Sequence, residues 1–156
     1  MGLFDKLKDV ANMVTGGAAR VSIEFEPAGA YPGENVSVRI TATSTSSGSS
    51  LNSRGAFVDL RAIEHVSVSR SAGSSSEQST HASHTHFEQS FQIAPAFTLA
   101  PNETKEFRGV VRLPSDAQPT FNGHYTRHEW SIRGRIEATG NDPDSGFQVI
   151  RVGTSF

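Results

Sequence analysis

The chain has 156 residues, with 14 Lys and Arg against 16 Asp and Glu, no Cys and a formal net charge of −2. This length fits one domain with its own core. The lack of Cys excludes disulfides, thiolate metal sites and a cysteine nucleophile. The Lys and Arg residues are scattered and form no basic stripe, so nucleic acid is not an expected partner. No run of 18 apolar residues predicts a membrane span, and no apolar stretch typical of a signal peptide is present, so we expect a cytoplasmic protein.

Residues 2–15 differ from the rest of the chain. Their apolar residues follow the i, i+3, i+4, i+7 spacing of one helical face, and Gly16-Gly17 is a typical helix end. We therefore expect an amphipathic helix within residues 1–17, followed by one domain over residues 18–156. Two Lys and two Asp make its polar face neutral, which favours docking on the protein's own sheet over anchoring to a membrane or a partner. The docking residues are predicted to be Leu3, Phe4, Leu7, Val10 and Val14.

From Val21 onward the apolar residues alternate with a period of two, which predicts strands separated by turns rich in Pro, Asn and Gly. The longest expected strand covers about residues 56–69. Glu64 and Ile63 break its alternation and predict a bulge. The Ser-rich segments 44–53 and 70–80 are predicted to be mobile loops. The predicted core residues are Val21, Ile23, Phe25, Val36, Val38, Ile40, Val58, Leu60, Phe107, Val111, Trp130, Ile132 and Ile136.

About eight strands without alternating helices predict an all-β, antiparallel, immunoglobulin-like sandwich. Five segments, in order, resemble the arrestin-like β-sandwich family: Tyr31-Pro-Gly-Glu opening the second strand, Leu113-Pro114, Pro119-Thr-Phe-Asn-Gly123, the strand led by Trp130, and the closing strand at 147–152. The amphipathic start followed by a hairpin is similar to the bacterial sporulation-control branch of that family. Arrestins have two such sandwiches, whereas this chain has room for one. The resemblance implies a non-enzymatic regulatory or scaffold module that binds another protein.

Three histidines within six residues, His81, His84 and His86, are candidate ligands for Zn, Cu or Ni. His84 and His86 are two apart and therefore lie on one face of a strand, whereas His81 has the opposite parity. A polar strand at the rim of a sheet explains the same pattern without a metal. A His-dependent metal-binding protein is accordingly an alternative function, as is a peripheral membrane protein anchored by the N-terminal helix.

No other motif predicts chemistry. His124 and His128 are interpreted as loop histidines rather than a catalytic or ligand pair. The segment 141–146 offers oxygens to calcium but lacks the ligand spacing of a calcium loop, so it is interpreted as a turn. The chain has no Gly-x-Ser-x-Gly motif. We expect no catalytic residue and no cofactor. The expected partner is a protein bound through a sheet edge, the loops or the helix, and a sheet edge also offers a route to a homo-oligomer.

Overall fold

The computed structural model describes residues 14–72 and 76–154, and these residues contain strands but no helix. No helix in this part is therefore long or apolar enough to cross a membrane. The described residues form eleven strands: β1 (Val14–Gly16), β2 (Ala19–Glu26), β3 (Gly29–Ala30), β4 (Asn35–Ser44), β5 (Leu51–Ala72), β6 (Ser76–Ala94), β7 (Phe97–Leu99), β8 (Thr104–Arg112), β9 (Phe121–Asn122), β10 (Thr126–Ala138) and β11 (Gln148–Val152).

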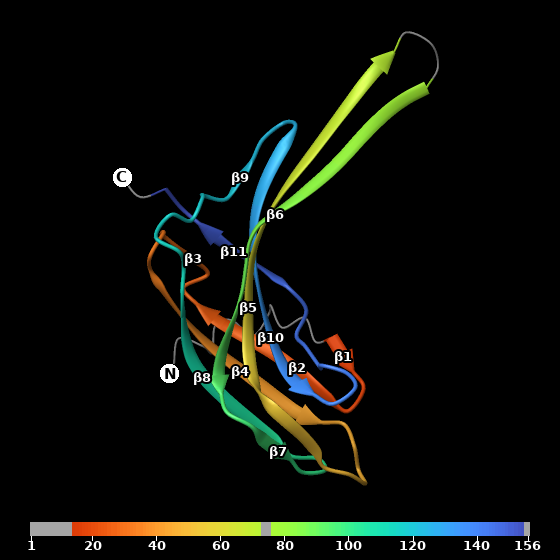
Figure 1. Cartoon of the computed structure of the whole chain (residues 1–156), viewed down its shortest axis with the longest axis vertical. Helices are drawn as coiled ribbons and strands as arrows, with labels where there is room; N and C mark the ends of the chain where they lie inside the picture. The colour runs from red at the N-terminus through yellow and green to blue at the C-terminus, as the bar shows by residue number, and fades with distance from the viewer. Residues whose placement is uncertain (1–13, 73–75, 155–156) are drawn as a thin grey trace.

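The strands form two sheets that pack face to face as a sandwich (Figure 1). One sheet has the order β1-β2-β4-β8. The other has the order β3-β11-β10-β5-β6, with β7 paired to β5 and β9 paired to β10. All pairings are antiparallel except that of β3 with β11. The predicted all-β antiparallel sandwich is thereby confirmed.

The core consists of the inward-facing residues of both sheets, as strand alternation predicts. Twelve of the thirteen predicted core residues are buried, and Phe107 is partly buried with its ring 4.5 Å from that of Phe97. The sheets approach each other closely at Gly134, where a Cβ would lie 2.9 Å from Ile40 Cγ1 and 3.2 Å from Ile23 Cβ. A residue with a side chain would not fit there without displacing these core residues.

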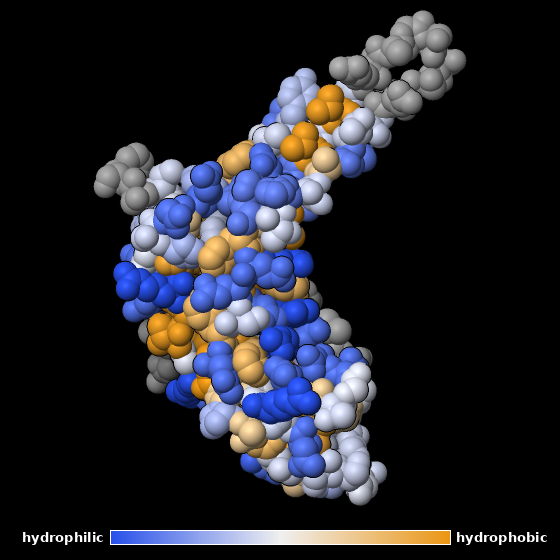
Figure 2. Space-filling model, viewed as in Figure 1, coloured by the Kyte–Doolittle hydropathy of each residue, from blue (hydrophilic) through white to orange (hydrophobic). Residues whose placement is uncertain are grey.

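The β5–β6 hairpin is the largest departure from a simple sandwich, because it extends as a two-stranded ribbon well beyond the other strands (Figure 1). Ser67 N still donates to the Tyr125 carbonyl at 2.8 Å, next to β10. Beyond it, β5 pairs within the described residues with β6 alone. Figure 2 shows a largely hydrophilic surface on this face, with apolar side chains interspersed, including on the ribbon.

Three local predictions need correction. Val14–Gly16, the predicted end of the N-terminal helix, is strand β1 paired with β2, and the rest of that helix lies outside the described residues. The segment 70–80 is not a loop, since residues 70–72 and 76–80 continue the paired strands. Ser, Glu, Gln and Thr make up most of this segment, so apolar alternation could not indicate its strands. The connection after β4 is also shorter than predicted, because β5 begins at Leu51.

The bulge predicted near Glu64 is confirmed, since the register between β5 and β6 shifts between Ala62 and Ile63. Before the shift Ala62 faces Phe87, and after it Ile63 faces Thr85, so His86 is the extra residue on β6. A bulge of this kind increases local twist and redirects the strand. It lies where the hairpin leaves the body of the sandwich.

Candidate partner-binding groove

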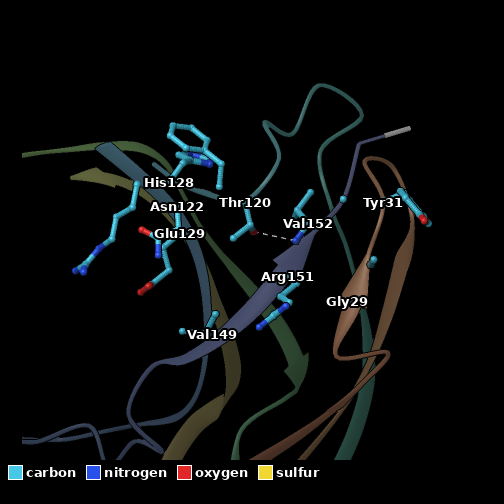
Figure 3. Close-up of a pocket in the computed structure, with 13 residues that line it drawn as sticks. Gly29, Tyr31, Thr120, Asn122, His128, Glu129, Val149, Arg151 and Val152 are labelled. Atoms are coloured by element: carbon cyan, nitrogen blue, oxygen red, sulfur yellow. Dashed lines mark hydrogen bonds between the residues drawn. The ribbon is translucent and has the colours of Figure 1, made fainter. Parts of the chain in front are cut away.

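A groove of about 730 Å³ lies at one end of the larger sheet, between the β9–β10 hairpin and the β3–β11 pair (Figure 3). Its floor and walls come from four segments that are far apart in sequence: Gly29–Tyr31, Thr120–Asn122, Arg127–Glu129 and Val149–Gly153. Two hydrogen bonds join two of these segments. Thr120 N donates to the Val152 carbonyl at 2.8 Å, and Val152 N donates to Thr120 Oγ1 at 3.0 Å. The groove is thus part of the folded framework.

The floor of the groove follows from strand alternation in β11. Gln148, Ile150 and Val152 are buried, whereas Val149 and Arg151 between them are exposed and line the groove. The alternating pattern therefore places one apolar and one cationic side chain on the outer surface. Neither side chain packs in the core.

Three large apolar side chains are exposed at this groove: Tyr31 (51%), Phe121 (43%) and Val149 (52%). They are half of the six large apolar residues that are exposed in the described part of the chain, so exposed apolar surface is concentrated here. The Tyr31 ring lies over Gly153, where a Cβ would be 2.8 Å from Tyr31 Cε1. Gly153 thus leaves space for the ring at the wall of the groove.

The charged residues of the groove are Arg127, Glu129 and Arg151. Among the residues that the structure describes, no ion pair joins any of the three to another side chain. Their sum is one positive charge. The groove therefore combines apolar surface with a modest cationic rim, a composition typical of sites that bind proteins.

The predicted metal-ligand candidates are divided by the fold. His84 and His86 lie on the same face of β6, with rings 4.8 Å apart, as the two-residue spacing predicts. His81 faces Ser67 in the ribbon, and its opposite parity places it on the other face. Among the described residues, no group of three His, Asp or Glu side chains is arranged around a metal site in the conformation of this structure.

His128 is not a loop histidine as predicted. It lies within β10, is 3% exposed, and lines the inner end of the groove. Its ring stacks on that of Phe121 at 6.1 Å and lies 5.5 Å from that of His86. His124 is exposed in the turn between β9 and β10, with its ring 4.4 Å from that of Tyr125. The two histidines therefore do not form a pair, because His124 lies in the exposed turn before β10 and His128 lies buried within that strand.

A second polar cluster lies on the outer face of the larger sheet, around the buried carboxylate of Asp59. Burial acts to raise the pKa of Asp59. The hydrogen bond from Ser90 Oγ (2.6 Å) and the guanidinium groups of Arg133 and Arg135 outweigh this effect and hold the pKa below its ordinary value. Each acceptor oxygen is thereby satisfied by protein donors. This cluster is a structural network that holds β5, β6 and β10 together.

The segment 141–146 is the connection between β10 and β11, as predicted. Asp142 Oδ1 accepts from Ala138 N at 3.0 Å, and Asp144 Oδ1 accepts from Gly146 N at 2.7 Å. Their second oxygens lie 3.6 Å from the guanidinium groups of Arg135 and Arg133, respectively. These carboxylates are engaged in turn hydrogen bonds and ion pairs, which fits the interpretation of the segment as a turn.

Comparison of the structure with solved structures found a similar fold in Spo0M, a sporulation control protein from Bacillus subtilis, with a TM-score of 0.62 and 22% sequence identity. The match covers 90% of this chain and 51% of that one. The chain has an arrestin-like fold. The resemblance deduced from the sequence motifs is thus confirmed at the level of fold, and the chain spans about half the length of Spo0M. No protein-family model matches the chain, and no curated protein matches it.

Proposed function

We propose that this protein is a non-enzymatic interaction module, and that it binds an extended segment of a partner protein in the groove. The observation that carries the proposal is that three exposed apolar side chains, Tyr31, Phe121 and Val149, line one groove. Exposed apolar side chains scattered singly need no explanation, whereas a cluster with a polar rim marks interaction sites. The fold shared with a sporulation control protein supports the same class of function.

The chemistry of the groove indicates the kind of segment it takes. Tyr31, Phe121 and Val149 offer contacts to apolar side chains, and aromatic residues are enriched at protein interfaces. Arg127 and Arg151 outnumber Glu129, so charge complementarity favours a segment with a carboxylate next to its apolar residues. The expected ligand is therefore a short apolar and acidic segment of a cytoplasmic protein.

Affinity capture with matched variants tests this proposal. The wild-type chain, the double variant Phe121→Ser/Val149→Ser and the control Val110→Ser are each used as bait in extract of the native cell. Val110 is 56% exposed on β8, on the other sheet, and does not line the groove. We expect the control to retain a partner that the double variant loses. Equal capture by all three, or recovery of only further copies of this chain, would contradict the proposal.

A further inference from the structure

A row of ionisable side chains occupies the inner face of the larger sheet, immediately beyond the core. Glu64 on β5 is the register partner of His84 on one side and of His128 on the other. The next pair on this face, Ala62 and Trp130, is buried in the core. The bulge adds His86 to the same group, since its Nε2 lies 3.0 Å from Glu64 Oε2. Three imidazoles and one carboxylate are thus brought together from three strands.

His128 carries the strongest indication of a ligand. Its Nδ1 lies 3.0 Å from the Pro119 carbonyl oxygen, which can only accept, so Nδ1 bears the proton of that hydrogen bond. The other nitrogen, Nε2, is buried and has no hydrogen-bond partner within the described residues. In the neutral imidazole this nitrogen holds a lone pair, and leaving a buried polar atom unpaired is unfavourable. Metal-binding histidines show this arrangement, with one nitrogen bound to a backbone carbonyl and the other free for the ion.

The spacing of the neighbouring groups suits zinc. Two ligand atoms at 2.0–2.1 Å from a tetrahedral Zn²⁺ are about 3.3 Å apart. His86 Nε2 and Glu64 Oε2 are 3.0 Å apart. Two imidazoles bound to one Zn²⁺ through Nε2 have ring centres roughly 5 Å apart, and the rings of His86 and His128 are 5.5 Å apart. A small movement would therefore allow an ion to replace the hydrogen bond between His86 and Glu64.

We propose that Glu64, His86 and His128 bind Zn²⁺, with His84 as a fourth ligand. The side chains are not closed around an ion as they stand. His128 is fixed by its burial and its hydrogen bond, whereas His84 and His86 are exposed at the surface of β6 and are free to rotate toward it. The proposed site includes two of the three histidines predicted from the sequence, His84 and His86. Its third histidine is His128 instead of His81, and it lies 42 residues further along the chain than His86.

Zinc titration of untagged, chelator-treated protein tests this site. Calorimetry should show saturable binding of about one Zn²⁺ per chain, and bound zinc should raise the melting temperature because it binds only the folded state. Co²⁺ in place of Zn²⁺ should give the visible absorption typical of four-coordinate cobalt. Glu64→Gln and His86→Gln should each weaken binding at least about tenfold. Both residues are partly exposed, so these variants should fold.

His81→Gln is the matched control, because His81 lies on the same strand but on the opposite face. It should bind Zn²⁺ like the wild type. His128→Gln should also lose binding if its circular dichroism shows a folded protein, and if it does not fold, Glu64→Gln and His86→Gln decide the question. The proposal is overturned if the wild type shows no saturable binding, if those two variants bind normally, or if His81→Gln weakens binding as much as His86→Gln.

Discussion

Glu64 and His128 lie directly opposite each other on β5 and β10, on the face of the sheet to which the neighbouring core pair Ala62 and Trp130 belongs. A carboxylate and an imidazole on a core-facing position would be costly inside the sandwich. Glu64 is tolerated because its carboxylate is partly exposed past the end of the core, and His128 is tolerated because its Nδ1 donates to the Pro119 carbonyl. Beyond this pair, β5 and β6 continue as the projecting ribbon.

Trp130 should make the largest single contribution to stability in this region. It is 2% exposed, its Nε1 donates to the Gln118 carbonyl at 2.7 Å, and its ring lies 5.4 Å from that of Phe87. Trp130→Ala should lower the free energy of unfolding by about 3–5 kcal/mol, measured by urea denaturation. The exposed Val110→Ala should change it by less than about 0.5 kcal/mol. A similar small loss for Trp130→Ala would show that the indole is not part of the core.

Gly134 is predicted to be intolerant of any side chain. Gly134→Ala would place a methyl group 2.9 Å from Ile40 Cγ1, so the side chains of Ile40 and Ile23 would have to be displaced. We expect a loss of about 1–3 kcal/mol in the free energy of unfolding. Gly48→Ala is the control, since nothing lies within 4 Å of a Cβ at that position. Equal stability of both variants in chemical denaturation would contradict the close approach of β10 to β4.

Asp59 should make stability depend on pH in the acidic range. Because its pKa is lower in the folded state than in the unfolded chain, its contribution is present above about pH 4 and is lost as the pH falls through the folded-state value. Asp59→Asn should therefore be less stable than the wild type at pH 7, and this difference should shrink toward pH 3. Asp116→Asn, at an exposed position, should leave the curve unchanged. A difference for Asp59→Asn that is independent of pH would mean that the lost contacts are not electrostatic.

The predicted docking helix is tested by deletion. Leu3, Phe4, Leu7 and Val10 lie outside the described residues, so docking on the domain stays a prediction. Removing residues 1–13 should lower the melting temperature and promote self-association, because burying a Leu or Phe is worth about 1.5–3 kcal/mol. Sedimentation and thermal melting measure both effects. Unchanged stability of the truncated chain, together with flotation of the intact chain with liposomes, would instead indicate a membrane anchor.

Much of the fold could be predicted from alternation alone, because a strand with one buried face repeats apolar residues at every second position. This rule places Val21, Ile40 and Ile132 in the core, and it indicates the bulge beside Glu64. The alternation rule fails for the ribbon, since two paired strands that do not pack on the core need no apolar residues at every second position. It also fails for β3 and β9, which are only two residues long.

The candidate sites were harder to predict, because they depend on register between distant strands. The parity of His84 and His86 could be deduced locally, whereas the approach of His128 to them requires the pairing of β6, β5 and β10. The groove likewise depends on the pairing of segments that are far apart in sequence. Tyr31, Phe121 and Val149 are each part of a recognised turn or strand motif, but nothing in the sequence indicates that they share one surface.

Site-specific photo-crosslinking tests most directly the central claim that the groove binds a partner protein. A photoreactive phenylalanine analogue is placed at position 149 in the groove or at position 110 on β8, and the cells are irradiated. We predict a discrete adduct with another protein from position 149, absent from position 110 and lost when Phe121→Ser is added. Adducts of equal yield from both positions, or none from position 149, would contradict the account.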